Sequence, residues 1–277
     1  MSFAVAVAAS GGRDSTALLH CTARLVRQHG GEVHALHVHH GLVAQADEWL
    51  AQVRAQCRRW GVHFHAARLT SGPDRGESLE AWARRERYQA LGEMARAAGC
   101  TLVLLAHHRR DQAETLLLQA LRGGGPAGLA AMPRSATRAG ITWARPWLHM
   151  PREAIEAYVA RHRLRWCEDA SNADTRFARN RLRALWPRWL QAFPDAESQL
   201  EAAAARAAEA AACLREQVAG DLVHVGGAGG LLDVAAWGTL SAPRRAQVLR
   251  AWLRGTDRKS TRLNSSHEWI SRMPSSA

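Results

Sequence analysis

The stretch FAVAVAASGGRDST, residues 3–16, decides the fold. Its apolar part, Phe3–Ala9, is typical of a buried strand, and it runs directly into a tight turn with the sequence SGG at residues 10–12. We expect a helix over Thr16–Gln28, closed by a pair of glycines at 30–31. A strand, a glycine turn and a helix in this order indicate one unit of an α/β fold.

The same alternation continues along the chain. We expect further strands at Val33–Val38, Val62–Leu69, Thr101–Ala106 and Ile141–Ala144, and helices at Ala46–Trp60, Glu77–Ala98, from about Asp111, and at Pro151–Arg163. Strands that alternate with helices predict a doubly wound parallel sheet. Ligands bind such sheets at the carboxyl ends of the strands. The expected site therefore lies at the turns that follow Ala9, Val38 and Ala106.

The second half of the chain is organised differently. Alanine-rich helical sequence covers Asp195–Ala219, and a further short helix is expected at Ala242–Arg254. We predict a catalytic domain at 1–193 and a small helical domain at 194–257. The single lysine of the chain, Lys259, opens a serine-rich segment without hydrophobic periodicity, and we predict that 258–277 is a foreign tail.

Composition limits the classes of protein. The formal net charge of +12, from 37 basic and 25 acidic residues, favours a polyanionic partner such as nucleic acid, although arginine-rich codon usage would give the same excess. Five cysteines without a C-x-x-C pair argue against a disulfide framework or a zinc knuckle. We found no signal peptide and no apolar run of membrane-spanning length. These features predict a cytoplasmic protein without a membrane partner.

The glycine turn has the chemistry of a phosphate site. Glycines let the backbone approach phosphate, and backbone N–H groups at a helix N-terminus bind its oxygens. The stretch SGGRDS at 10–15 is no Walker A loop, because that loop needs a lysine. The simpler alternative is a glycine-rich turn with capping Ser and Asp side chains.

A second group of polar residues is HHRRDQAET at 107–115. Asp111 and Glu114 are three residues apart, so their carboxylates share one face in the first turn of a helix. They suit a metal–nucleotide complex or the deprotonation of an amine. The alternative is that the two acids have no function beyond the mild stabilisation that acidic residues commonly give to a helix N-terminus. The neighbouring His107 favours a functional role.

These motifs resemble a known family. SGGRDS is similar to the pyrophosphate-binding loop of the N-type ATP pyrophosphatases, whose PP-loop fold is adenine nucleotide alpha hydrolase-like. The chain resembles the tRNA(Ile)-lysidine synthetases over about residues 3–190, through HHRRDQAET and the ordered motifs HVHHGL at 37–42, EAWARRERY at 80–88, LRGGGPAGL at 121–129, EDASNAD at 168–174 and RNRLR at 179–183.

The resemblance implies an ATP- and Mg²⁺-dependent enzyme. It would adenylate the wobble cytidine of a CAU-anticodon tRNA(Ile), and the ε-amine of L-lysine would then displace AMP to give lysidine. The implied ATP-binding residues are Ser10, Gly11, Gly12, Arg13, Asp14 and Ser15, with Asp14 also a Mg²⁺ ligand. Asp14, Arg87, His107, Asp111 and Glu114 are the implied catalytic residues. The implied substrate or tRNA contacts are His39, His40, Arg84, Asn172, Asp174, Arg179, Asn180 and Arg183.

Several alternatives stay open at this point. Arg84 is nearly as well explained by a solvated helix face, and Asn172, Asp174 and Asn180 by turn and cap chemistry. Arg110 stands where many members of the family have Asp or Asn. The rival functions are a tRNA thiolase, an amidotransferase-linked synthetase and an inactive nucleotide- or RNA-binding remnant. A homodimer is also left open.

Overall fold

The computed structural model of the chain describes residues 3–39, 41, 45–69, 72–73, 76–168, 174–226 and 230–260, with Glu80 and 255–260 described by their backbone alone. The strands are β1 (Ala4–Ala8), β2 (Glu32–His39), β3 (His63–Arg68), β4 (Leu102–Leu104), β5 (Ser135–Arg138) and β6 (Ile141–Ala144). The helices are α1 (Arg13–Gln28), α2 (Ala46–Trp60), α3 (Leu79–Ala97), α4 (Arg109–Leu121), α5 (Pro126–Leu129), α6 (Arg152–Arg161), α7 (Ala178–Ala192), α8 (Ala196–His224), α9 (Val234–Thr239) and α10 (Ala242–Ser260).

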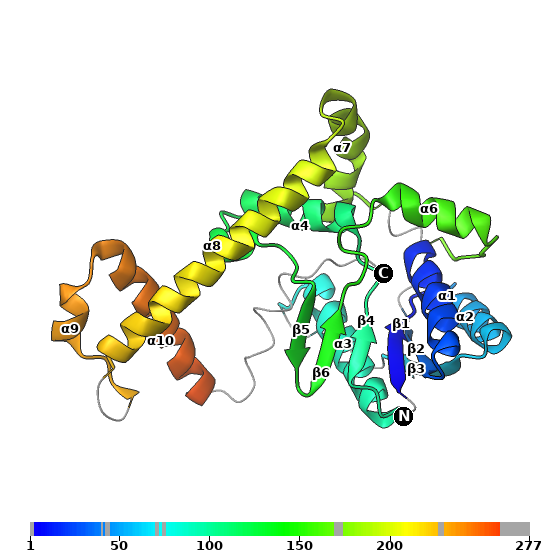
Figure 1. The fold of residues 1–277 in the computed structure, drawn as a ribbon, viewed down its shortest axis with the longest axis horizontal. Helices are drawn as coiled ribbons and strands as arrows, with labels where there is room; N and C mark the ends of the chain where they lie inside the picture. Colours follow the sequence, from blue (N-terminus) through cyan, green and yellow to red (C-terminus); the bar gives the residue numbers. More distant parts are fainter. Residues whose placement is uncertain are drawn as a thin grey trace.

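One six-stranded sheet forms the centre of the N-terminal part, in the order β3-β2-β1-β4-β6-β5. Every neighbouring pair is parallel except β5 with β6, which form an antiparallel edge. Figure 1 shows α1 and α2 on one side of the sheet and α3 on the other. The predicted doubly wound parallel sheet is therefore confirmed, with one antiparallel edge strand that the sequence did not suggest.

Both faces of the sheet are covered by apolar side chains. Val5, Val7 and Ala35 pack with α1 and α2 in one core, whereas Leu36 and Val103 pack with α3 and β6 in another. Because side chains alternate along a strand, β1 contributes to both cores from successive residues. This two-sided burial explains why the central strands read as continuous apolar runs in the sequence.

The strand order brings two loops together. The chain leaves β1 toward β2 on one side and returns later to place β4 on the other side of β1. The reversal between β1 and β4 is a topological switch point, where the loops after the two strands diverge and leave a crevice. The glycine turn after β1 and the histidine pair after β4 therefore face the same crevice.

The C-terminal part consists of helices. The first half of α8 packs on α4 and α5 through a cluster that contains Leu116, Ala131 and Ala204. Its far end packs with α9 and α10 through Val225, Leu240 and Val248, and Figure 1 shows α8 as the arm that joins the two regions. Within the described residues, no helix is both long and apolar enough to cross a membrane.

Candidate nucleotide and acidic site

A cavity of about 800 Å³ opens at the carboxyl ends of β1 and β4. Its wall is built from the glycine turn, the first turns of α1 and α4, one face of α3 and the segment that follows α6. The polar and aromatic lining residues include Ser10, Gly12, Arg13, Asp14, Ser15, Arg87, Tyr88, His107, His108, Arg110, Asp111, Glu114, Arg152, Trp166, Glu168 and Arg183. The two motifs that the sequence singled out therefore line one cavity.

The glycine turn is shaped to present backbone N–H groups. Gly11 has φ +92°, a conformation that L side chains rarely adopt, and Gly12 is the N-cap of α1. The helix starts at Arg13, three residues before the predicted Thr16, so Asp14 and Ser15 lie in its first turn. The first N–H groups of a helix lack partners within it and attract anions. The geometry suits a phosphate group.

The loop is held in place from two sides. The Oγ atoms of Ser10 and Ser15 are 2.9 Å apart. The backbone N–H of Cys167 donates to the carbonyl of Gly11 at 2.9 Å, so the segment after α6 lies against the loop. A ring nitrogen of His37 donates to the carbonyl of Ala9 at 2.7 Å and fixes the end of β1.

Replacing Gly11 with alanine is expected to weaken ATP binding about tenfold or more. The new Cβ would lie 3.2 Å from Cγ2 of the buried Val53, at a backbone conformation that costs a non-glycine residue about 1–3 kcal/mol. Relaxation of this strain would displace the N–H groups of the loop. Isothermal titration with ATP measures the effect.

The matched control is Gly140→Ala. Gly140 also has a positive φ, +77°, but no atom lies within 4 Å of its added Cβ and it is far from the cavity in sequence and fold. This variant should lose some stability and keep its ATP affinity. Equal ATP affinity in the Gly11 and Gly140 variants would contradict a phosphate role for the loop.

His108 connects the two motifs. Its Nε2 lies 3.6 Å from a carboxylate oxygen of Asp14 and 3.5 Å from one of Asp111. The Asp111 carboxylate also accepts a hydrogen bond from the backbone N–H of His108 at 3.0 Å, which caps α4. One imidazole therefore joins the first turn of α1 to the first turn of α4.

The charges of this group stabilise one another. Burial opposes the charged form of His108, but the carboxylates of Asp111 and Asp14 outweigh it and raise the pKa of His108. Burial also opposes ionisation of Asp14, yet His108 and Arg13 hold its pKa below the ordinary value. The pKa of Asp111 is lowered as well, because His108 and neighbouring cations outweigh its burial. These shifts favour the ionised form of the two acids and the protonated form of the imidazole between them.

Glu114 is paired with two arginines from α7. Arg179 Nε lies 2.8 Å from one carboxylate oxygen, and Arg183 Nε lies 3.0 Å from the other. Only 1% of the Glu114 side chain is exposed. Arg183 also reaches Asp111 at 3.4 Å, and Arg179 donates to the hydroxyl of Thr115 at 2.9 Å. These contacts fix α7 against α4.

His107 and Arg84 differ in whether they line the cavity and in how burial affects their charge. Burial, together with the charge of Arg145, lowers the pKa of His107 well below its ordinary value, so this cavity residue is neutral. Arg84 is buried outside the lining of the cavity, with its guanidinium 5.6 Å from the centre of the Tyr88 ring. Burial lowers the pKa of Arg84 to about 9. The solvated helix face suggested for Arg84 is therefore wrong.

Other predicted contact residues lie away from the cavity wall. His39 is buried at the end of β2 with Nε2 3.3 Å from Asp47. Asp174 forms an exposed ion pair with Arg176 at 2.7 Å, and Asn180 donates to the Asp174 carbonyl at 2.9 Å. These contacts are of the kind that stabilise turns and helix caps, which is the simpler explanation given above for Asp174 and Asn180. His40 and Asn172 lie outside the described residues.

Arg110 has partners that explain its presence. Its guanidinium forms an ion pair with Glu197 of α8, reaches Glu153 of α6 at 3.2 Å and lies 5.9 Å from the ring centre of Trp186. The Trp186 indole N–H also donates to Glu197 at 2.8 Å. Arg110 therefore joins α4 to α7 and α8, a contact that an acidic residue would not make with Glu197.

The sequence did not identify all the residues of the cavity. His108 was noticed only as part of a histidine doublet, although it contacts both acids. Tyr88 and Trp166 supply aromatic walls from α3 and from the segment after α6. The doublet at a strand end was the available signal for His108, whereas nothing in the local sequence distinguishes Trp166 from a core residue.

The fold and this cavity define a nucleotide-binding α/β protein of the PP-loop class, and a family model described as a PP-loop domain matches residues 2–189. A relative from Ralstonia nicotianae, a tRNA(Ile)-lysidine synthase, is 47% identical over 253 residues, and one of the same name from Polaromonas naphthalenivorans is 42% identical over 253 residues. The chain belongs to the tRNA(Ile)-lysidine synthase family.

The chain spans only part of the length of these two relatives, and a second family model matches its C-terminal part. The two alignments cover 91% of this chain, but 54% of the Ralstonia protein and 75% of the Polaromonas protein. A model described as the TilS substrate binding domain matches residues 232–269, which include part of the segment that we predict to be foreign. The domain limits therefore stay predictions.

A solved structure supports the fold alone. The U34-tRNA thiolase NcsA from Methanococcus maripaludis, solved with its 4Fe–4S cluster, superposes with a TM-score of 0.62 at 14% sequence identity. The superposition covers 74% of this chain and 72% of NcsA.

Proposed function

We propose that this chain uses ATP to join L-lysine to the wobble cytidine of a CAU-anticodon tRNA(Ile). The observation that carries the proposal is the position of His108, which contacts Asp14 beside the glycine turn and Asp111 on α4. It brings a phosphate-binding loop and a pair of acids into one cavity. The names of the relatives and the net charge of +12 support a tRNA substrate.

The reaction has two steps. The 2-carbonyl oxygen of the cytidine attacks the α-phosphorus of ATP, and pyrophosphate leaves. The ε-amine of lysine then attacks C2 of the base, the bond from C2 to the adenylated oxygen breaks, and AMP leaves while the amine loses a proton. Adenylation is needed because a carbonyl oxygen is a poor leaving group and AMP is a good one.

The residues of the first step lie around the glycine turn. The N–H groups at the start of α1 would hold the phosphates, and Arg87 on α3 faces the same cavity. Mg²⁺ is usually held by one or two carboxylates together with substrate phosphates, where it neutralises their charge. Asp14 and Asp111 fit this role, since both are ionised hard ligands that line the cavity.

Arg13, which lines the cavity and stays a predicted ATP contact, also has contacts that suit a second task. Its guanidinium lies 2.6 Å from Glu156 of α6 and 3.0 Å from Asp14. We therefore assign it to holding α6 and Asp14 in place, beside the phosphates.

For the second step we assign the binding of the lysine ε-amine to Asp111. Glu114 is already paired with Arg179 and Arg183, so it is better suited to holding Asp111 and α7 in position. Asp111 is connected through His108 to Asp14, beside the glycine turn. An ionised carboxylate there would bind and orient the ε-ammonium through its negative charge. The neutral His107 would supply a hydrogen bond rather than a charge.

The rival functions predict different chemistry. A thiolase with an iron–sulfur cluster needs several cysteines in one place, but no group of three cysteines occurs among the described residues, and Cys167 is the only cysteine that lines the cavity they form. An amidotransferase-linked synthetase would need ammonia from a glutaminase. An inactive remnant would bind ATP or RNA without turnover. We propose that the enzyme acts in the cytoplasm, and the homodimer stays a prediction.

The test is incubation of the chain with ATP, labelled lysine and unmodified CAU-anticodon tRNA(Ile). We expect label in the tRNA only when all three are present, with one AMP and one pyrophosphate for each lysine. A transcript with uridine at the wobble position is the matched control and should stay unlabelled.

Three outcomes would contradict the proposal. Incorporation of sulfur from a sulfur donor would favour a thiolase. Use of ammonia in place of lysine would favour an amidotransferase-linked enzyme. ATP binding without any labelled tRNA would favour the inactive remnant.

A further inference from the structure

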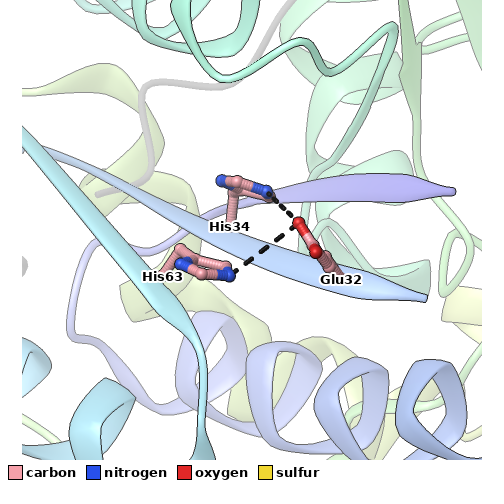
Figure 2. A group of neighbouring side chains, drawn as sticks. All are labelled: Glu32, His34 and His63. Carbon is pink, nitrogen blue, oxygen red and sulfur yellow. Dashed lines mark ion pairs between the residues drawn. The ribbon is translucent and has the colours of Figure 1, made fainter. Parts of the chain in front are cut away.

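A cluster of histidines with one carboxylate lies on the sheet face that α3 covers. Glu32 and His34 are on β2, and His63 is on the edge strand β3. His34 and His63 are direct partners in the parallel register, and their rings stack with centroids 4.8 Å apart. Figure 2 shows both rings pointing toward the Glu32 carboxylate.

The distances between the ligand atoms suit a small cation. Nε2 of His34 lies 3.8 Å from a carboxylate oxygen of Glu32, and Nε2 of His63 lies 3.9 Å from the same oxygen. One ligand atom from each residue lies within 4.8 Å of the other two. Neighbouring ligands of a tetrahedral zinc ion are about 3.3–3.5 Å apart, as follows from bonds of about 2.0–2.2 Å. To reach this spacing, the ligand atoms of the three side chains would need to approach one another by less than about 1.5 Å.

A second observation points to a ligand. The His34 side chain is only 10% exposed, and its Nε2 is buried without a hydrogen-bond partner, because the Glu32 oxygen at 3.8 Å is too far away to accept a hydrogen bond. An unpaired buried nitrogen is unfavourable, and a bound cation would satisfy it. The other ring nitrogen, Nδ1, is 3.0 Å from Nε2 of His65. When Nδ1–H donates to His65, the Nε2 lone pair points at the cluster, as in many histidine–metal sites.

We propose that Glu32, His34 and His63 bind one divalent transition-metal ion, for which Zn²⁺ is the representative. Two imidazole nitrogens and one carboxylate oxygen form a donor set that zinc uses widely, with water as the fourth ligand. Hard cations such as Mg²⁺ and Ca²⁺ prefer sites made of oxygen alone. Glu32 and His63 are each 58% exposed, so an ion can enter from solvent.

The site is separate from the ATP cavity. Glu32 is the first residue of β2 and His63 the first of β3, whereas the cavity opens at the opposite ends of the strands. The eight residues of β2 span roughly 25 Å. The ion would link the edge strand β3 to its neighbour, so its effect should appear in stability before it appears in turnover.

Calorimetric titration of the chelator-treated chain with ZnCl₂, in excess Mg²⁺, tests the proposal. We expect one ion per chain, and at least tenfold weaker binding by His63→Ala and by Glu32→Gln. Both substitutions are at exposed side chains, so the variants should fold without zinc, which circular dichroism checks. Zinc should raise the Tm of the wild type and not that of the variants.

His29→Ala is the matched control, because His29 is an exposed histidine outside the cluster. It should bind zinc like the wild type. Substitution of Co²⁺ for Zn²⁺ reports the ligands, and we expect a tetrahedral spectrum without a thiolate charge-transfer band. The proposal is overturned if the wild type does not bind zinc, if His63→Ala binds it equally well, or if the thiolate band places the ion on cysteine.

Discussion

Asp111→Asn is expected to lower kcat/KM for lysidine formation by about 10²–10³-fold, the usual cost of removing one preorganised charged group. The substitution keeps the shape of the side chain and removes the charge that His108 and Arg183 face at 3.5 and 3.4 Å. Without that charge the pKa of His108 should fall, because the Asp111 carboxylate is the largest contribution that raises it. The site would lose the carboxylate of Asp111, and the protonated form of His108 would be less favoured.

Labelled-lysine incorporation measures this effect, and ATP titration accompanies it. The control is Glu93→Gln, which removes an exposed carboxylate of α3 that accepts a hydrogen bond from the Gln89 amide at 3.1 Å. Its activity should equal that of the wild type. Near-wild-type turnover by Asp111→Asn would remove Asp111 from the chemistry and leave it a helix cap.

Glu114→Leu is expected to reduce the free energy of unfolding by about 3–5 kcal/mol, the usual cost of removing one partner of a buried ion pair. Glu114 and Arg179 are 1% and 5% exposed, so solvent cannot replace the missing carboxylate. Arg179 would be left buried and charged between α4 and α7. Urea unfolding, with a check that the m-value is unchanged, measures the loss.

The double variant Glu114→Leu/Arg179→Leu makes this test specific. When both charges are removed, no buried arginine is left without its counter-charge, because Arg183 is partly exposed and keeps Asp111 at 3.4 Å. The double variant should therefore be more stable than Glu114→Leu alone. If the two substitutions instead destabilise additively, the side chains contribute through packing and not through their pairing.

Much of the central sheet could be predicted because its signals are local. A buried parallel strand reads as an apolar run, and a glycine turn marks its end, so β1 and the loop to α1 were placed from residues 3–12 alone. The α2 limits, Ala46–Trp60, agree with the prediction because Gly61 ends the helix in the left-handed conformation. The start of α1 was set too late, since the helix begins directly after Gly12.

The parts of the fold and site that were not predicted depend on contacts between residues far apart in the sequence. Strand β5, Ser135–Arg138, has no apolar alternation because it is an edge strand, exposed at every second residue. Helix α7 was not predicted, since its arginines and the internal Pro187 weaken the local signal. Its Arg179 and Arg183 are placed by Glu114, and no local pattern gives that pairing. The partners of Arg110 are equally remote in the sequence.

Helix α8 has a mechanical consequence. Its 29 residues form one unbroken rod of about 43 Å, anchored at its first turn through Glu197 to Arg110 and Trp186. A tilt of about 5° at this pivot would swing the distal end by about 4 Å, close to the spacing of neighbouring bases in a strand. The stiffness of the rod thus sets how far α9 and α10 can move relative to α4 and the crevice beside it.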